Sequence, residues 1–218
     1  MVYKKGDAEL IKSWRPIALA NGVYNLWTAL VTRLLVDYAE RHSTIQSCQE
    51  GFRRGGITAR QLSKMLLAIE DAHMTGSELH RMYIDFENAF GSPDHARLLW
   101  VMEYLGLPRE AIEVVGNLYP GSREDGEPMS MRVRTPYGDT GDIAVRRGTT
   151  QGDTLSPLLF MFYIEPLLRW LSAGREGYTH GLSGAKTSAP TFADDLALLS
   201  ENVTDMCTQL DQVRRYSE

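Results

Sequence analysis

The chain has 218 residues, of which 43% are hydrophobic and 23% are charged, and its formal net charge is −5. These values are typical of a globular protein with one core, or one domain with a subdomain, and exclude a disordered or fibrous chain. The longest apolar run, 158–164, is far too short to span a membrane, and the two isolated cysteines, Cys48 and Cys207, have neither zinc-site nor disulfide spacing.

The charge is unevenly distributed along the chain. Residues 1–60 contain nine Lys and Arg and five acidic residues, so their net charge is +4 (9 − 5), and that of residues 61–218 is −9 (−5 − 4). A basic part suits contact with phosphates, and an acidic part suits metal binding. Because no signal-peptide pattern opens the chain, we expect an intracellular protein without membrane contact, in the nucleus or the cytoplasm.

The first half of the chain is predicted to be mainly helical, with one strand. Apolar residues at three- and four-residue spacing predict a helix with one apolar stripe after Asn21-Gly22, and a second amphipathic helix over 62–69. Period-two alternation over 82–86 predicts a short strand. Ser92, as N-cap, is expected to start a helix that ends near Gly106, and Pro108 to start another.

The second half is predicted to combine hairpins with helices. Alternation over 129–147 predicts a hairpin, and the helix after Ser156-Pro157 is apolar nearly all round, so it should be central. Residues 174–189 read as a Gly- and Ser-rich loop, and a last helix is expected over 204–218. Because helices and hairpins interleave, the fold class is α+β rather than a parallel α/β sheet.

Three acidic residues are the candidates for metal binding. Asp194 and Asp195 interrupt an apolar stretch, which predicts a hairpin with its turn at the acids. Two adjacent carboxylates at about 4 Å repel by about 4 kcal/mol at an effective dielectric near 20, so a cation is needed between them. Asp85 ends the predicted strand, and pairing of the two strands would bring it to Asp194. Mg²⁺ is normally held by carboxylates together with substrate phosphates.

Five segments, in order along the chain, resemble those of reverse transcriptases of the non-LTR (LINE-type) retrotransposon class. Three look like the polymerase motifs: Tyr83 to Phe90, Arg147 to Pro157, and Phe192-Ala193-Asp194-Asp195. Two are similar to finger segments: Trp14 to Leu19, and Gln49 to Thr58. The resemblance implies a right-hand polymerase, with partial fingers over 1–78 and an antiparallel palm sheet packed on helices over 79–218, truncated before the thumb. It also implies a fragment of a longer retroelement polyprotein.

The resemblance further implies an RNA-directed DNA polymerase that adds deoxynucleotides to a DNA primer on an RNA template. Two Mg²⁺ ions, for which Mn²⁺ can substitute, would be held by Asp85, Asp194 and the Phe86 carbonyl, with Asp195 assisting. The predicted nucleotide-binding residues are Arg15, Phe90, Gln151 and Gly152. Phe90 would exclude ribose by clashing with its 2′-hydroxyl, the group that distinguishes RNA from DNA.

Two further expectations concern the basic residues and the alternatives. Arg53 and Arg54, in the Gly-rich loop, are candidates for contact with nucleic acid, although a solvated face explains them equally well. One alternative is a catalytically silent remnant that binds nucleic acid. The other is an RNA-dependent RNA polymerase, against which Phe90 and Phe192-Ala193 weigh. Since the family places a further lysine and the thumb beyond this segment, we expect the chain to polymerise poorly alone.

Overall fold

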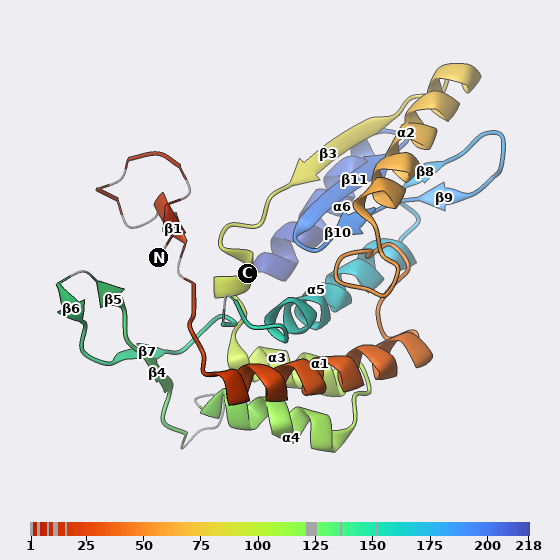
Figure 1. The fold of residues 1–218 in the computed structure, drawn as a ribbon. Coiled ribbons are helices and arrows are strands. Elements are labelled where there is room, and N and C mark those ends of the chain that lie inside the picture. The colour runs from red at the N-terminus through yellow and green to blue at the C-terminus, as the bar shows by residue number, and fades with distance from the viewer. Residues whose placement is uncertain are drawn as a thin grey trace. The chain divides into compact units, whose positions relative to one another are not determined.

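The computed structural model describes residues 2–3, 5–7, 9–10, 13–15, 17–120, 126–135, 137–150 and 152–218. They form two compact units, each built from two stretches of chain (Figure 1). The first unit comprises residues 1–38 and 88–163, and the second comprises residues 39–87 and 164–218. All pairings between strands are antiparallel, which confirms the expected mixture of helices and hairpins. The division into fingers and palm stays a prediction.

The first unit is a helical layer with three small two-stranded ladders. Its strands are β1 (Val2–Tyr3), β2 (Trp14–Arg15), β4 (Met129–Met131), β5 (Arg134–Thr135), β6 (Gly138–Asp139) and β7 (Ile143–Val145). They pair as β1–β2, β4–β7 and β5–β6, so the hairpin expected over 129–147 is confirmed. Its helices are α3 (His95–Tyr104), α4 (Arg109–Leu118) and the 3-10 turn η2 (Ala89–Gly91). Two longer helices, α1 (Gly22–Arg41) and α5 (Ser156–Ala173), begin in the first unit and end in the second. Fully buried Leu98, Met102 and Leu159 belong to its core.

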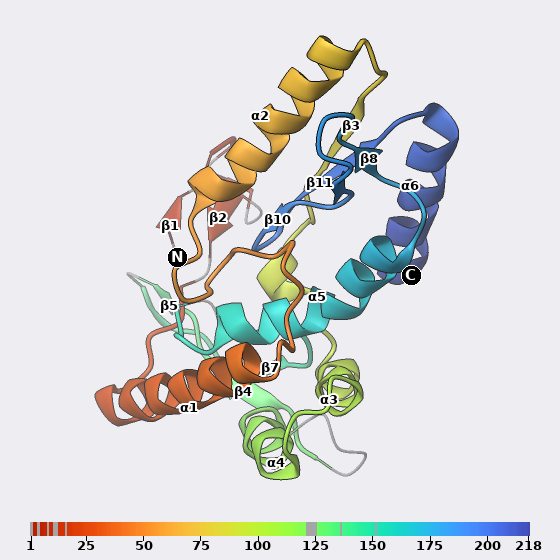
Figure 2. The same cartoon turned by 90° about the vertical axis from the view of Figure 1, so that its right-hand side faces the viewer.

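The second unit is a three-stranded sheet in the order β10-β11-β3, formed by Thr191–Phe192, Asp195–Ser200 and His80–Ile84. In Figure 2 this sheet lies between α2 (Thr58–Thr75) and α6 (Val203–Ser217). The outer side of β10 is bridged by Gln49, which pairs in parallel with Thr191. In the described parts of the chain no strand pairs with the outer side of β3, so β3 is the open edge of the sheet.

The local signals at the helix ends explain where the sequence was right and where it was not. Gly106 has φ 76°, as expected of a glycine after a helix. The N-cap of α3, however, is Asp94, whose carboxylate accepts the Arg97 N–H at 3.0 Å, and not Ser92. The Ser92 hydroxyl instead donates to the Ala89 carbonyl. Ser92 therefore serves the preceding turn, and Asp94 takes the capping position.

Much of the apolar stripe of α1 is exposed rather than buried. Val23, Leu26 and Leu30 are 80%, 75% and 55% exposed, whereas Leu35 of the same stripe is only 4% exposed and the polar Thr28 is fully buried. The helix itself was predicted correctly, but only part of its apolar side packs in the described chain. Separately, none of the helices in the described residues combines the length and apolarity needed to cross a bilayer.

A short hairpin lies where the sequence predicted only a loop, within 174–189. Strands β8 (Tyr178–Thr179) and β9 (Lys186–Thr187) pair with each other, and the hairpin is anchored on α2 by the buried carboxylate of Asp71. That carboxylate accepts the Tyr178 hydroxyl at 2.7 Å and the amides of Gly181 and Leu182 at 2.8 and 3.2 Å. The Tyr178 hydrogen bond is the main reason that the pKa of Asp71 is lowered.

Asp71→Asn is expected to lower the unfolding temperature at pH 7. An amide offers one acceptor oxygen where the carboxylate offers two, so a buried donor loses its partner. Since the folded-state pKa of Asp71 is depressed, its contribution is present above the unfolded pKa, near 3.9, and is lost as the pH falls below that value. Thermal unfolding at pH 7 and at pH 3 should therefore show a smaller difference between wild type and variant at pH 3. An equal difference at both pH values would contradict this, and exposed Glu70→Gln is the control.

Candidate active site

The ends of two neighbouring strands bring the predicted acids together. Antiparallel β10 and β11 pair Phe192 with Asp195, which leaves Ala193 and Asp194 as the two-residue turn of the hairpin. On the other side of β11, Leu196 pairs with Ile84 of β3. Continued by one residue, this register sets Asp85 opposite Asp195 at the same end of the sheet, with the Phe86 carbonyl directly after it. The expected hairpin is confirmed, but its turn is Ala193-Asp194, one residue before the predicted pair of acids, because Asp195 already belongs to β11.

The carboxylates of Asp85, Asp194 and Asp195 have no partner inside the described chain. None of them accepts a hydrogen bond or pairs with a basic side chain there, and Asp85 and Asp195 are exposed, whereas Asp194 is half-buried. In that same part of the chain no three His, Cys, Asp or Glu side chains are arranged to hold a metal ion. Unpaired carboxylates at one sheet end fit Mg²⁺, which proteins hold with one or two carboxylates and substrate phosphates rather than an all-protein cage.

Phe90 lies in η2, in the first unit, and its ring packs on Phe160 of α5 with centroids 5.3 Å apart. Its carbonyl accepts two hydrogen bonds from Thr149, from the amide at 2.6 Å and from the hydroxyl at 3.2 Å. The segment of the first polymerase motif is thereby tied to that of the second. Phe90 is half-buried, so one part of its ring packs and another part faces solvent.

The same two segments meet at a glycine pair. Gly148 has φ 85°, and a Cβ built there would lie 2.7 Å from the Gly91 Cα and 2.8 Å from its carbonyl oxygen. The Gly148 amide donates to the Pro93 carbonyl at 2.8 Å, and the Gly148 carbonyl accepts from His95 Nε2 at 2.8 Å. Only glycine combines this backbone conformation with so close an approach. The loop that leads to Gln151-Gly152 is therefore fixed at its start.

The predicted nucleotide-binding residues are only partly within the described chain. Gln151 lies outside it, and of Arg15 only the backbone, in β2, is described. Gly152 has φ 107°, and a Cβ there would lie 3.1 Å from the Ala18 carbonyl. The Gly152 backbone thus lies against the segment of residues 14–19, which the sequence assigned to the fingers.

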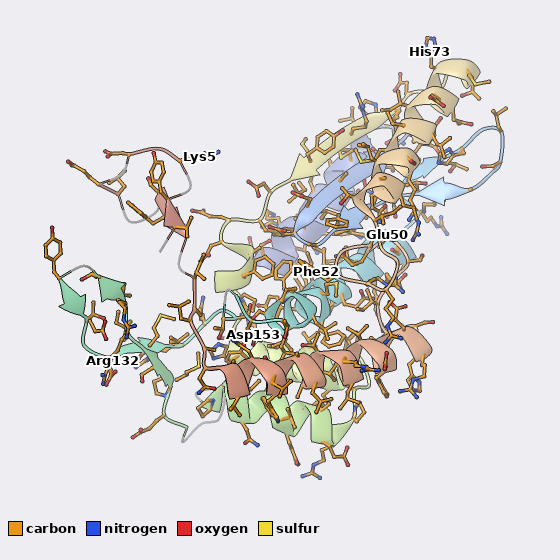
Figure 3. The ribbon with its side chains drawn as sticks, viewed as in Figure 1. Lys5, Glu50, Phe52, His73, Arg132 and Asp153 are labelled. Atoms are coloured by element: carbon orange, nitrogen blue, oxygen red, sulfur yellow. The ribbon has the colours of Figure 1, made fainter. Side chains whose placement is uncertain are left out.

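A buried polar cluster around Asp153, which directly follows Gly152 in sequence, was not predicted. The Asp153 carboxylate, which is buried, accepts the Leu155 amide at 3.2 Å and the Tyr24 hydroxyl at 3.5 Å (Asp153 is labelled in Figure 3). Burial and the negative charge of Asp153 raise the pKa of Tyr24 to about 12. The only hint of this cluster in the sequence was an acidic residue directly after Gln151-Gly152. Nothing in the sequence pointed to Tyr24, which lies 129 positions away from Asp153.

Arg53 and Arg54 differ in their surroundings. The Arg53 guanidinium forms a two-pronged ion pair with Glu40, at 3.0 and 2.8 Å, and donates to the carbonyls of Gln46 and Gln49. Glu40 raises the pKa of Arg53, mainly through these hydrogen bonds. The Arg54 side chain is exposed. Arg53 therefore holds its own loop together, and contact with nucleic acid stays a prediction for both residues.

The predicted site residues fall into the two compact units. Asp85, Phe86, Asp194 and Asp195 belong to the second unit, as do Arg53 and Arg54. Phe90, Gln151, Gly152 and Arg15 belong to the first. Within the second unit the strand registers set the acids near one end of the sheet, and within the first unit hydrogen bonds join the segments that carry Phe90 and Thr149.

Comparison with known proteins gives consistent matches. Residues 2–218 match the family described as reverse transcriptase (RNA-dependent DNA polymerase). The chain is 29% identical over 225 residues to a retrovirus-related Pol polyprotein from the type-1 retrotransposable element R2 of Popillia japonica. That alignment covers 99% of this chain and 29% of the relative. It is 28% identical over 200 residues to a probable RNA-directed DNA polymerase from transposon BS of Drosophila melanogaster, over 91% of this chain and 20% of the relative.

A solved structure shares the fold. A telomerase from Candida tropicalis, in complex with a fragment of telomeric RNA, superposes with a TM-score of 0.60 at 10% identity, over 90% of this chain and 32% of that one. At this identity the likeness concerns the fold alone. This chain thus spans less than a third of the length of each of these proteins.

Proposed function

Because this chain belongs to the reverse transcriptase (RNA-dependent DNA polymerase) family, we propose that it extends a DNA primer with deoxynucleotides on an RNA template, as the polymerase domain of a non-LTR retrotransposon protein. The observation that carries the proposal is the register of β3 and β11, which brings Asp85 and Asp195 to one end of the sheet beside Asp194. These acids, up to 110 positions apart (195 − 85), have no basic partner in the described chain, which supports a role in binding cations.

In this proposal Asp85, Asp194 and the Phe86 carbonyl hold two Mg²⁺ ions, and Asp195 orients or assists. The chemistry that bound Mg²⁺ supplies is a lowered pKa of the primer 3′-hydroxyl and neutralisation of the charge that develops on the leaving pyrophosphate. The chain itself contributes the positions of the carboxylates that would hold the ions. Asp195 is a ladder residue of β11, Asp85 directly follows the last ladder residue of β3, and the turn at Ala193 and Asp194 would set the third carboxylate beside them.

In the same proposal, Arg15, Phe90, Gln151 and Gly152 bind the incoming nucleotide. The Arg15 guanidinium would pair with the triphosphate, and the Gln151 amide and the Gly152 backbone would lie along the nucleotide and the template base. The proposal is supported by contacts between the segments that carry these residues. The Thr149 amide donates to the Phe90 carbonyl, and the Gly152 backbone lies against Ala18. Residues 1–78 would then serve as fingers and residues 79–218 as palm, with Arg53 and Arg54 toward nucleic acid.

Primer extension by the 218-residue chain tests the proposal. The assay compares an RNA with a DNA template, deoxynucleotides with ribonucleotides, and Mg²⁺ with EDTA. Because the chain alone is expected to polymerise poorly, we expect slow deoxynucleotide addition on RNA, which EDTA abolishes. Preference for ribonucleotides would favour an RNA polymerase, and nucleic-acid binding without any extension would favour a silent remnant. Extension that persists in EDTA would refute the metal assignment.

Phe90→Ala is expected to admit ribonucleotides. The phenyl ring would exclude the 2′-hydroxyl by bulk alone, and its removal should raise ribonucleotide incorporation relative to deoxynucleotide incorporation by about a hundredfold. The ratio of the two kcat/KM values is the measurement. Phe160→Leu, which changes the neighbouring ring without changing Phe90, is the control for altered packing. An unchanged ratio in Phe90→Ala would remove Phe90 from sugar selection.

A further inference from the structure

The turn that carries Asp194 has an unfavourable backbone conformation. Ala193 has φ 57°, the left-handed region in which a residue with a Cβ is disfavoured. Ala193 is also buried, so its backbone amide and carbonyl need partners within the protein. Two-residue hairpin turns favour positive φ at their first residue, usually with Gly, Asn or Asp there. Because this position is alanine, the turn carries a conformational cost that contacts from the rest of the protein can offset.

One buried side chain supplies those contacts. Gln49 is fully buried, and its Nε2 donates to the Ala193 carbonyl at 3.1 Å while its Oε1 accepts the Ala193 amide at 2.8 Å. The same Oε1 accepts the Gly51 amide at 2.8 Å. A single amide group therefore satisfies both backbone groups of the strained residue, from a loop 144 positions earlier in the sequence.

The loop also presses against the turn sterically. A Cβ on Gly51 would lie 2.8 Å from the Ala193 Cα, so the loop backbone approaches the turn as closely as a glycine allows. Glu50 and Phe52, which flank Gly51, are labelled in Figure 3. The turn is thus held by hydrogen bonds from Gln49 and by contact with Gly51.

We propose that Gln49 is a positioning residue that sets the place of Asp194 in the active site; this inference rests on the proposed polymerase function. Asp195 is a ladder residue of β11, and Asp85 directly follows the last ladder residue of β3. Asp194 lies outside both ladders, and its place depends on the conformation of Ala193. Gln49 is the side chain that holds that conformation.

The chain offers a matched control in Gln61. This glutamine is 5% exposed, and its Nε2 donates to the carbonyls of Cys48 and Thr191. It therefore holds the same loop against the same strand, β10, and in the described chain it makes no hydrogen bond to the turn itself. Gln49→Leu and Gln61→Leu remove the same kind of buried amide, and only the first removes the partner of Ala193.

Amide hydrogen exchange gives the first readout. Exchange at Ala193 is measured relative to the amide of Leu199, which donates to the Ser188 carbonyl at 2.8 Å and reports the stability of the sheet. We expect Gln49→Leu to speed relative exchange at Ala193 at least about tenfold and Gln61→Leu to leave it unchanged. Should Gln49→Leu fail to fold, Gln49→Asn, which is one methylene too short to reach both groups, takes its place. Unchanged relative exchange at Ala193 would overturn the inference.

Primer-extension kinetics give the second readout. A misplacement of about 1 Å can cost about a hundredfold in rate, so we expect kcat to fall by about that factor in Gln49→Leu with the KM for deoxynucleotide retained. Gln61→Leu should keep its kcat once the folded fraction is taken into account. Equal kcat losses in both variants would overturn the positioning role. If Asp194→Asn kept full activity, the polymerase proposal would fail instead, whereas the exchange result would still report on the turn.

Discussion

Asp194→Asn is expected to reduce RNA-templated primer extension on the order of a thousandfold or more. Stabilisation of transition-state charge by a bound metal amounts to several kcal/mol, and each 1.4 kcal/mol is a factor of ten in rate. An amide cannot replace an anionic carboxylate as a ligand of Mg²⁺ with the same strength. The measurement is kcat for deoxynucleotide addition at saturating Mg²⁺, with Glu70→Gln as the control for loss of one exposed negative charge.

The same substitution should not destabilise the fold. The Asp194 carboxylate has no partner in the described chain and stands next to Asp195 in sequence, so removal of its charge relieves repulsion. Urea unfolding should therefore give an unchanged or slightly higher free energy of unfolding, opposite in direction to the loss of activity. An active variant, or an inactive one that has also lost its fold, would contradict the catalytic assignment of Asp194.

Gly148→Ala is expected to destabilise the first unit by about 2–5 kcal/mol. A left-handed backbone costs a residue with a Cβ roughly 1–2 kcal/mol, and overpacking of a well-packed site costs about 1–3 kcal/mol more. The new methyl group would lie within 2.9 Å of three Gly91 backbone atoms, which cannot rotate away as a side chain can. Urea unfolding of the purified variant measures the effect.

Gly106→Ala separates the two contributions. Gly106 has φ 76° in the same unit, but a Cβ there would meet no atom within 4 Å. Its substitution should therefore cost only the conformational part, roughly 1–2 kcal/mol. Equal losses at the two positions would show that the close approach of Gly148 to Gly91 contributes nothing. Thr149 directly follows Gly148 and donates to the Phe90 carbonyl. We therefore also expect Gly148→Ala, but not Gly106→Ala, to change the preference for deoxynucleotides over ribonucleotides.

The sequence predicted the elements with strong local signals. The hairpin at Asp194 is bounded by apolar runs on both sides, and the helices that follow Asn21 and Pro108 begin within a residue of their expected starts. The sequence predicted that pairing of the two apolar strands would bring Asp85 to Asp194; the strands do share a sheet, and their register, continued by one residue, sets Asp85 opposite Asp195, next to Asp194. The family followed from the order of five segments, none of which is specific alone.

What the sequence did not reveal depends on tertiary contacts. The two-residue strands β8 and β9 are too short for a periodic pattern, and they exist because Asp71, on a distant helix, binds their hairpin. The largely exposed apolar stripe of α1 shows that periodicity predicts where apolar residues line up on a helix. It does not predict whether other parts of the protein pack against them. Gln49 and Tyr24 act across more than 100 positions, and no local rule connects them with Ala193 or Asp153.

The unequal edges of the three-stranded sheet restrict how it can grow. On the β10 side, the backbone groups of Thr191 that a further strand would need are already bonded, because its amide donates to the Cys48 carbonyl and its carbonyl accepts the Glu50 amide. On the β3 side those groups remain available along His80–Ile84 within the described chain. A strand added by β-augmentation, whether from a longer polypeptide or from another molecule, therefore has to align beside β3. Asp85 directly follows β3, so such an addition would run up to the acids themselves.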